Sequence, residues 1–242
     1  MSQLFQRSSV HTLSLILALC LAAAPALAQK KGNRANDARR HTTDAATVFD
    51  EIMSSSDSSI PKELVDKAQA IAVFPGVLKA AVIVGGREGK GVISRRNAAG
   101  WSAPAFFNLA GGSFGAQIGA NKTDYVLLIM NEKGLDKLLA DKFELGGEVG
   151  VAAGPVGREA SAATDAQLNA EILTYSRSKG AFVGAALKGT TITPDNHLNE
   201  AFYGLNARDI LTGGVSSTPN LCWSIRKPWL VTSSSFGMSG KT

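Results

Sequence analysis

The stretch NLAGGSFGAQIGA, from Asn108 to Ala120, decides between two kinds of fold. It contains the run Gly111 to Gly115, a G-x-S-x-G pattern that presents the nucleophilic serine in some hydrolases. That geometry needs a parallel strand before the serine and a helix after it. After Ser113, however, apolar residues alternate with glycine or glutamine as far as Gly119, which is the period of a strand. Residues 113–119 are therefore predicted to form a glycine-rich strand, and the helix that a nucleophilic serine requires is absent from the pattern.

Short apolar, β-branched runs separated by glycine-containing turns continue on both sides of this stretch. They predict strands over residues 71–74, 77–84, 91–96, 101–108, 113–119, 125–130, 148–152, 158–163, 171–178 and 181–187, with Gly85–Gly89 as a turn. Four helices are expected, over residues 45–53, 61–70 and 132–141 and, as a short one, around residues 200–205. The predicted fold class is α+β and β-rich. Glycines inside the strands favour a strongly curled antiparallel sheet or barrel, with two of the few short helices at the N-terminus.

The chemistry of a hydrolase is hard to assemble from this sequence. The base for Ser113 would be His197, with Asp195 as its acidic partner, although an orienting aspartate usually comes from a separate loop. Histidine and cysteine are too few and too far apart for a dedicated metal site, so no metal or other cofactor is expected. The sequence predicts that the protein is not an enzyme, with a serine hydrolase as a distant alternative.

The N-terminus has the features of an export signal. Arg7 precedes an apolar run over residues 13–24, and Ala26-Leu27-Ala28 is a small-x-small cleavage site. Residues 1–28 are thus predicted to be removed, leaving an exported protein that is periplasmic or peripherally membrane-associated. Cys20 allows a lipoprotein alternative, but the bulky Leu19 before it argues against acylation.

The remaining chain is predicted to form one domain between basic ends. The formal net charge is +5, and residues 29–43 form a basic leader that is expected to be disordered. The domain is expected over residues 44–205, and a C-terminal helix and flexible tail over residues 206–242. A nearly neutral body argues against nucleic acid as a partner. Cys222 would be the only thiol after signal removal, so a homodimer through Cys222 is an open alternative.

Six blocks of sequence together resemble one family. They are GKGVISRR (Gly89–Arg96), GWSAPAFF (Gly100–Phe107), GGSFGAQIGANKTDYVLLI (Gly111–Ile129), AAGPVGR (Ala152–Arg158), YSRSKGAFVGAALKG (Tyr175–Gly189) and NEAFYG (Asn199–Gly204). In this order they are similar to the SYLF domain, also called the Ysc84 domain, over residues 60–204. The resemblance implies a lipid-binding module: eukaryotic members bind phosphoinositides and membranes, and some bind actin. Because an exported bacterial member would meet no actin, actin is not expected as a partner here.

The resemblance leads to a non-enzymatic protein that binds anionic phospholipid head groups through a basic patch. Head-group candidates are the cations around one predicted hairpin and those inside the later blocks, namely Arg87, Lys90, Arg95, Arg96, Arg158, Arg177, Lys179 and Lys188. They could equally be solvated charges or partners of Glu148, Glu159 and Glu171. An acyl pocket could be lined by Trp101, Phe106, Phe107 and Phe182, although strand aromatics are more often core. The alternative function is a structural or protein-interaction protein of the cell envelope.

Overall fold

The computed structural model describes residues 33–55, 59–81, 84–98, 100–114, 119–140, 142–147, 150–157, 170–178, 181–184, 187 and 189–215. The predicted signal segment, Cys20, Cys222 and the C-terminal tail lie outside these residues. None of the described helices is both long and apolar enough to cross a membrane.

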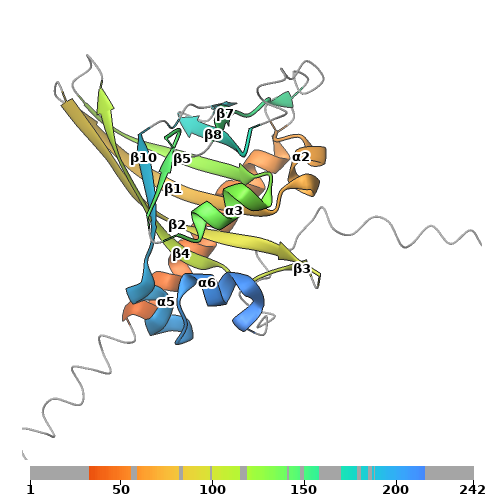
Figure 1. The fold of residues 1–242 in the computed structure, drawn as a ribbon. Coiled ribbons are helices and arrows are strands. Elements are labelled where there is room, and N and C mark those ends of the chain that lie inside the picture. Colours follow the sequence, from red (N-terminus) through yellow and green to blue (C-terminus); the bar gives the residue numbers. More distant parts are fainter. Residues whose placement is uncertain are drawn as a thin grey trace, which may run out of the picture.

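The fold is built on one strongly curled, nearly closed sheet of ten strands (Figure 1). The main path runs in the order β6 (Phe143–Leu145), β10 (Thr190–Pro194), β4 (Ala105–Phe114), β2 (Val84–Asn97), β1 (Ala70–Ala81), β5 (Gly119–Ile129), β8 (Ile172–Ser178) and β7 (Val151–Ala153). The short β3 (Gly100–Trp101) pairs with β2, and β9 (Ala181–Gly184) pairs with β8. The predicted α+β class with a curled sheet is confirmed. One pairing, β7 with β8, is parallel, so the sheet is mixed.

The G-x-S-x-G run begins at the end of a strand, and the strand predicted over residues 113–119 does not appear as one element: Phe114 ends β4, residues 115–118 lie outside the described residues, and Gly119 begins β5. Gly111, Gly112 and Ser113 belong to β4, and Ser113 pairs with Gly85 of the antiparallel strand β2. His197 lies beyond the opposite end of β4, because Pro194 at the end of β10 pairs with Phe107. Six residues of strand between Phe107 and Ser113 correspond to about 20 Å. The backbone therefore keeps the predicted serine and histidine far apart.

Gly85–Gly89 is part of β2, and the prediction of a turn there is wrong. Glycine is needed for close packing of β2 on β1: a Cβ at Gly89 would lie 2.6 Å from Cγ2 of Val77, and one at Gly91 would overlap the ring of Phe74. Glycine in a strand can mark a place where a neighbouring strand approaches closely. A glycine-rich segment is also typical of a turn, so composition alone does not distinguish the two.

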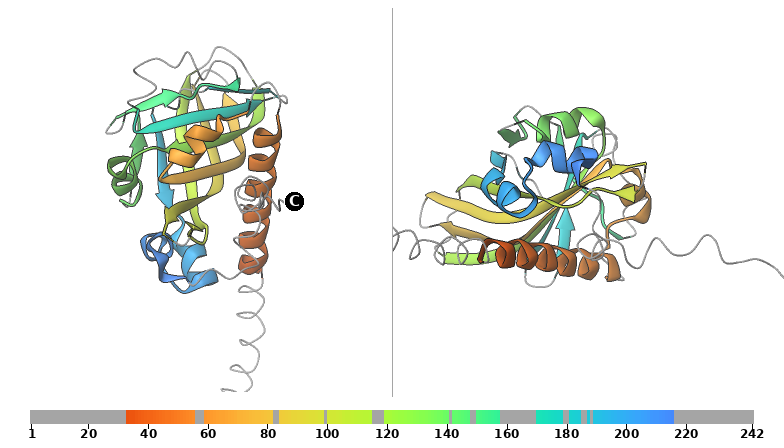
Figure 2. Two further views of the ribbon diagram at one scale, coloured as in Figure 1. Left: turned by 90° about the vertical axis from the view of Figure 1, so that its right-hand side faces the viewer. Right: turned by 90° about the horizontal axis from the view of Figure 1, so that it is seen from below.

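The sheet buries both of its faces (Figure 2). The concave inner face carries alternate residues such as Phe74, Phe107 and Leu127, packed with α3 (Glu132–Leu138), α6 (Ala207–Asp209) and η2 (Ile210–Gly214). The outer face carries the other set, including Phe106 and Val126, and is covered by a helix over residues 33–54, by α2 (Lys62–Lys67) and by α5 (Asn196–Tyr203).

The helix over residues 33–54 differs from the disordered leader expected over residues 29–43 and from the predicted helix start at Ala45. Its buried positions include Ala38, Thr42, Ala45, Phe49 and Ile52, which follow helical spacing from one end to the other. The first of these are small, so they give no hydrophobic stripe in the sequence. They nevertheless allow the helix to lie close against the sheet.

The packed core also continues past the predicted domain end at Leu205. Ile210 and Leu211 are fully buried in the inner-face cluster, although residues 206–242 were expected to form a helix and flexible tail. A domain that ended at Leu205 would leave this part of the inner face uncovered.

Candidate functional site

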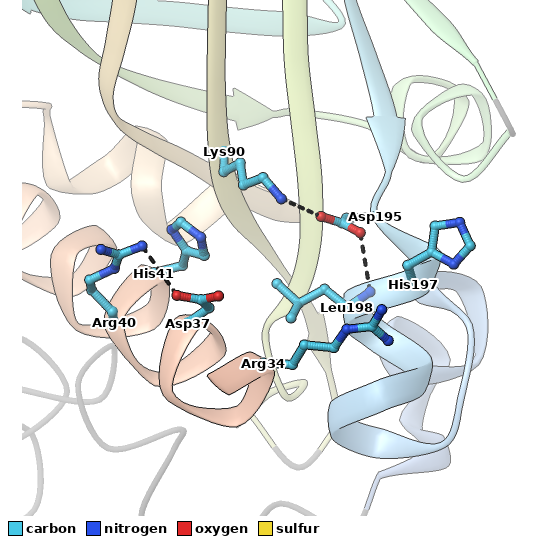
Figure 3. A pocket seen from close by; sticks show the side chains of 8 residues that line it. All are labelled: Arg34, Asp37, Arg40, His41, Lys90, Asp195, His197 and Leu198. Atoms are coloured by element: carbon cyan, nitrogen blue, oxygen red, sulfur yellow. Dashed lines mark hydrogen bonds and ion pairs between the residues drawn. The ribbon is translucent and has the colours of Figure 1, made fainter. Parts of the chain in front are cut away.

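A charged groove runs along the edge of the N-terminal helix where that helix meets the outer face of the sheet. One part of it, about 530 Å³, is lined by Arg40, His41, Asp44, Thr47, Val48, Glu51, Pro75, Gly76, Gly89, Lys90, Lys122 and Arg177. An adjoining hollow of about 340 Å³ shares three of these residues and adds Arg34, Asp37, Asp195, His197 and Leu198 (Figure 3). The helix residues recur every three or four positions, so one helix face supplies that wall.

Arg177 joins the groove's two walls at one end. Its guanidinium donates to Asp124 of β5, with Nε and Nη2 at 2.9 and 2.7 Å from Oδ2, and Nη1 pairs with Glu51 of the helix. Asp124 is held by a second donor, since the backbone NH of Gly76 lies 2.7 Å from its Oδ1. Gly76 has a φ of +56° in the bulge of β1, a conformation that favours glycine. The bulge thus positions the carboxylate that orients Arg177.

Lys90 forms the corresponding contact at the other end of the groove. Its Nζ lies 2.9 Å from Oδ2 of Asp195, while Oδ1 of Asp195 accepts from the backbone NH of Leu198 at 3.1 Å (Figure 3). Asp195 is therefore the N-cap of α5, which explains its position better than a role beside His197. Arg40 and Asp37 pair at 3.3 Å on the exposed side of the helix.

His41 is a titratable residue whose pKa is shifted by this groove. Partial burial lowers its pKa, and the nearby charges of Lys90 and Arg40 lower it further against the opposing effect of Asp37 and Asp44. His41 is thus favoured in its neutral form between the helix and the sheet. Arg34 and Lys122 also line the groove, and no ion pair among the described residues involves either of them.

The predicted head-group residues are divided between several places. Lys90 and Arg177 both line the groove. Arg87 and Arg95 project from the inner face of β2, because alternate residues of a strand point to opposite sides. Arg95 pairs with Glu132 at 3.5 Å. The single patch expected around the hairpin therefore does not form.

Arg96 lies on the outer face of β2, where its side chain is held by contacts within the protein. Its guanidinium donates to the carbonyls of Ala68 and Val65 at 3.0 Å each and lies 4.4 Å from the ring centre of Trp101. Arg158, Lys179 and Lys188 lie outside the described residues.

The predicted acyl-pocket aromatics belong to two different cores. Phe107 is buried in the inner-face cluster, whereas Trp101 and Phe106 are buried in the outer-face cluster. Phe106 stacks on Tyr203, with ring centres 6.0 Å apart. These three side chains do not line a common cavity, because they project from the sheet in different directions. The side chain of Phe182 lies outside the described set.

A curled sheet with both faces covered, and with a groove of paired charges along a helix, defines an α+β domain. Residues 110–225 match the family model described as Ysc84, Las17-binding protein actin regulator. The chain carries a Ysc84 (SYLF) domain, which confirms the resemblance found in the sequence blocks. No solved structure matches the chain.

Yeast and vertebrate proteins are among the relatives of the chain. It is 37% identical over 171 residues to the yeast LAS seventeen-binding protein 3, a match that covers 68% of this chain and 37% of the relative. It is 36% identical to the yeast protein YSC84 and 34% identical to the mouse SH3 domain-containing YSC84-like protein 1, covering 36% and 51% of those proteins. The chain thus spans about a third to a half of the length of these relatives.

These matches correct one expectation. Actin was not expected as a partner, but the matching family is described as an actin regulator, and the yeast relative is named for binding LAS seventeen. The family model and the yeast LAS seventeen-binding protein 3 are described by what they bind rather than by a reaction they catalyse.

Proposed function

We propose that this chain is a non-catalytic interaction domain that binds a protein partner along the groove between the N-terminal helix and the sheet. The observation that carries the proposal is the mixed charge of the groove. Arg40, Lys90 and Lys122 lie beside Asp44 and Glu51 along one surface. A partner that presents both signs of charge complements such a surface better than a uniformly anionic layer does.

An exposed apolar residue beside the groove supports the same proposal. Among the described residues, Leu78 is a large hydrophobic residue that is 48% exposed. It lies directly opposite Lys122 on the neighbouring strand. Protein interfaces combine apolar contacts with charged residues at their rim. Leu78 would supply an apolar contact next to the unpaired charge of Lys122.

The class of partner follows from the relatives. Because the family is described as Las17-binding and actin-regulating, we propose actin filaments or a Las17-type actin-regulatory protein as the partner. The relatives are longer than the shared region, so their partner could contact either part of them. This proposal assigns binding to the shared domain.

Co-sedimentation with actin filaments and pull-down with Las17 test the proposal on this chain alone. We expect binding to at least one of the two, weakened about tenfold or more by Lys122→Glu, because interface charge reversal places like charges together. Lys142→Glu is the matched control, since Lys142 is exposed and does not line the groove. Absence of binding to both proteins, or equal loss in both variants, would contradict the proposal.

Anionic lipid is the second candidate partner, supported by a specific observation. Lys90 and Arg177, two of the predicted head-group residues, line one groove together with Arg40 and Lys122. Each basic residue near an anionic surface contributes about 1 kcal/mol of attraction. Flotation with phosphatidylcholine liposomes, with and without phosphatidylglycerol, distinguishes the candidates. Flotation that needs phosphatidylglycerol and is lost in Lys122→Glu, without binding to either protein, would favour lipid.

A further inference from the structure

A row of polar residues crosses the inner face of the sheet, on the side opposite the groove. Lys79 of β1 pairs with Arg87 of β2, Arg87 pairs with Gly111 of β4, and Gly111 pairs with Thr190 of β10. Asn121 of β5 extends the row beyond Lys79. Directly opposite residues of neighbouring strands have their Cβ atoms about 4.5–5.5 Å apart. The strands β5, β1, β2, β4 and β10 lie next to one another in this order (Figure 1).

The row contains positive charge that nothing in the described structure neutralises. Lys79 and Arg87 are like charges at directly opposed positions, an arrangement that destabilises a sheet. The inner-face neighbours two residues along the strands are uncharged, namely Val77, Gly85, Gly89, Leu109, Thr123 and Ile192. No ion pair among the described residues involves Lys79 or Arg87.

Two buried donors in this row have no hydrogen-bond partner. Nε of Arg87 and Oγ1 of Thr190 are both shielded from solvent and unpaired, and the Thr190 side chain is fully buried. An unsatisfied buried polar group costs free energy, and most native groups of this kind have a partner. Two such donors in one row, beside two unneutralised cations, indicate that a group with acceptor oxygens belongs there.

Gly111 separates these donors and has no side chain. A Cβ at this position would lie 3.0 Å from the backbone of Thr190 and 3.1 Å from its Oγ1. Any other residue at position 111 would therefore place its Cβ between the threonine hydroxyl and Arg87. Glycine leaves that approach open.

We infer that Lys79, Arg87 and Thr190 form an oxyanion site on the inner face of the sheet, with Gly111 providing its space. The ligand is a phosphate group carried by a small soluble molecule or by a lipid head group. A guanidinium and an ammonium supply charge-assisted hydrogen bonds to phosphate oxygens, and the threonine hydroxyl donates a further one. Asn121 is exposed while Thr190 is buried, so the row leads from solvent into the curled sheet.

Inorganic phosphate is the first probe, added to the full chain at constant ionic strength with chloride as the reference. The thermal unfolding midpoint is expected to rise saturably with phosphate in the unaltered protein, because a ligand that binds the folded state stabilises it. Arg87→Gln and Thr190→Val are each expected to weaken the apparent affinity, the former about tenfold or more. Lys62→Gln, which removes an exposed cation of α2 outside the groove, is the matched control and should leave the response unchanged.

A second measurement separates a ligand site from a purely structural role. Without phosphate, Arg87→Gln should keep or raise the unfolding midpoint, because it removes repulsion from Lys79. A structural arginine would instead lower the midpoint and leave the phosphate response intact, and that result would overturn the inference. In the unaltered protein, the Arg87 Nε–H resonance should shift on titration with phosphate.

Vesicles distinguish the two sources of the phosphate group. Phosphatidylcholine vesicles with added phosphatidic acid should bind in an Arg87-dependent manner if the group belongs to a lipid, and inorganic phosphate alone should act if it belongs to a soluble molecule. A response to neither probe, or the same response in Arg87→Gln, would refute the site. Because Arg87 and Thr190 lie on the inner face and do not line the groove, the Arg87 dependence is independent of partner binding there.

Discussion

Two pairs of cations on opposite faces of the sheet have different surroundings. On the outer face, Arg177 and Lys90 each contact a carboxylate, and helix residues contribute to both the groove wall and its ion pairs. On the inner face, Lys79 and Arg87 lie opposite each other above an apolar core, with no acidic neighbour in the described part of the sheet. Paired charge is consistent with a surface that holds a helix in place. Unpaired charge indicates a place for an external anion.

The comparison depends on the N-terminal helix being an integral part of the domain, and Phe49→Ala is the strongest test of that. Phe49 is 2% exposed in the outer-face cluster. Its removal is expected to lower the free energy of unfolding by about 3–5 kcal/mol through lost burial and the cavity left behind. Urea denaturation followed by circular dichroism measures this. Thr47→Ala, two residues away and exposed, should change little; equal small effects would mean that the helix is not packed as described.

The ion pairs of the outer face should differ in strength according to exposure. Asp124 has a 16% exposed side chain and accepts from both Arg177 and the Gly76 backbone, so Asp124→Ala is expected to cost about 1–3 kcal/mol. The Glu51 side chain is 48% exposed and pairs with Arg177, so Glu51→Ala should cost less than about 1 kcal/mol. Urea denaturation at low and high salt measures both. A larger loss in Glu51→Ala would show that the helix contact, rather than the bulge, organises Arg177.

The sheet could be predicted from the sequence because its signal is local. Strand alternation in β4 and the β-prone run in β5 identify these elements without any knowledge of their partners. The strand β10 was missed, since its five residues TTITP end in proline and lie beside the β4 edge. The sequence also did not predict that residues 84–97 form one strand. Arg87 and Lys90 were therefore assigned to one patch, although they point to opposite faces of β2.

The groove could not be predicted because one of its walls includes the first half of the N-terminal helix, and the start of that helix was predicted at Ala45. Ala38 and Thr42 are small, and the segment around them is rich in charge, which is typical of a disordered leader when packing is ignored. The signal that could have identified it is the spacing of Ala38, Thr42, Ala45, Phe49 and Ile52. Without that helix, Arg34, Arg40 and His41 have no position relative to the sheet.

The effect of pH on His41 is the smallest expected difference between the faces, and it is specific to the outer one. Burial, with Lys90 and Arg40 nearby, lowers the pKa of His41 below its ordinary value of 6.5. The unfolded chain therefore binds more protons than the folded one between the two pKa values, and stability must rise with pH across that window. Its contribution is complete above about pH 7 and is lost as the pH falls through 6.5 towards the lowered pKa.

Proton NMR titration of the His41 ring measures this pKa directly. In Lys90→Gln the pKa of His41 is expected to rise, because a nearby positive charge is removed and the protonated ring is less opposed. Arg87→Gln, which changes a cation on the other face of the same strand, should leave it unchanged. A His41→Gln variant should lose the part of the acid destabilisation that this residue causes. If Lys90→Gln and Arg87→Gln shifted the pKa of His41 equally, the two faces would not be electrostatically separate, and the contrast between them would fail.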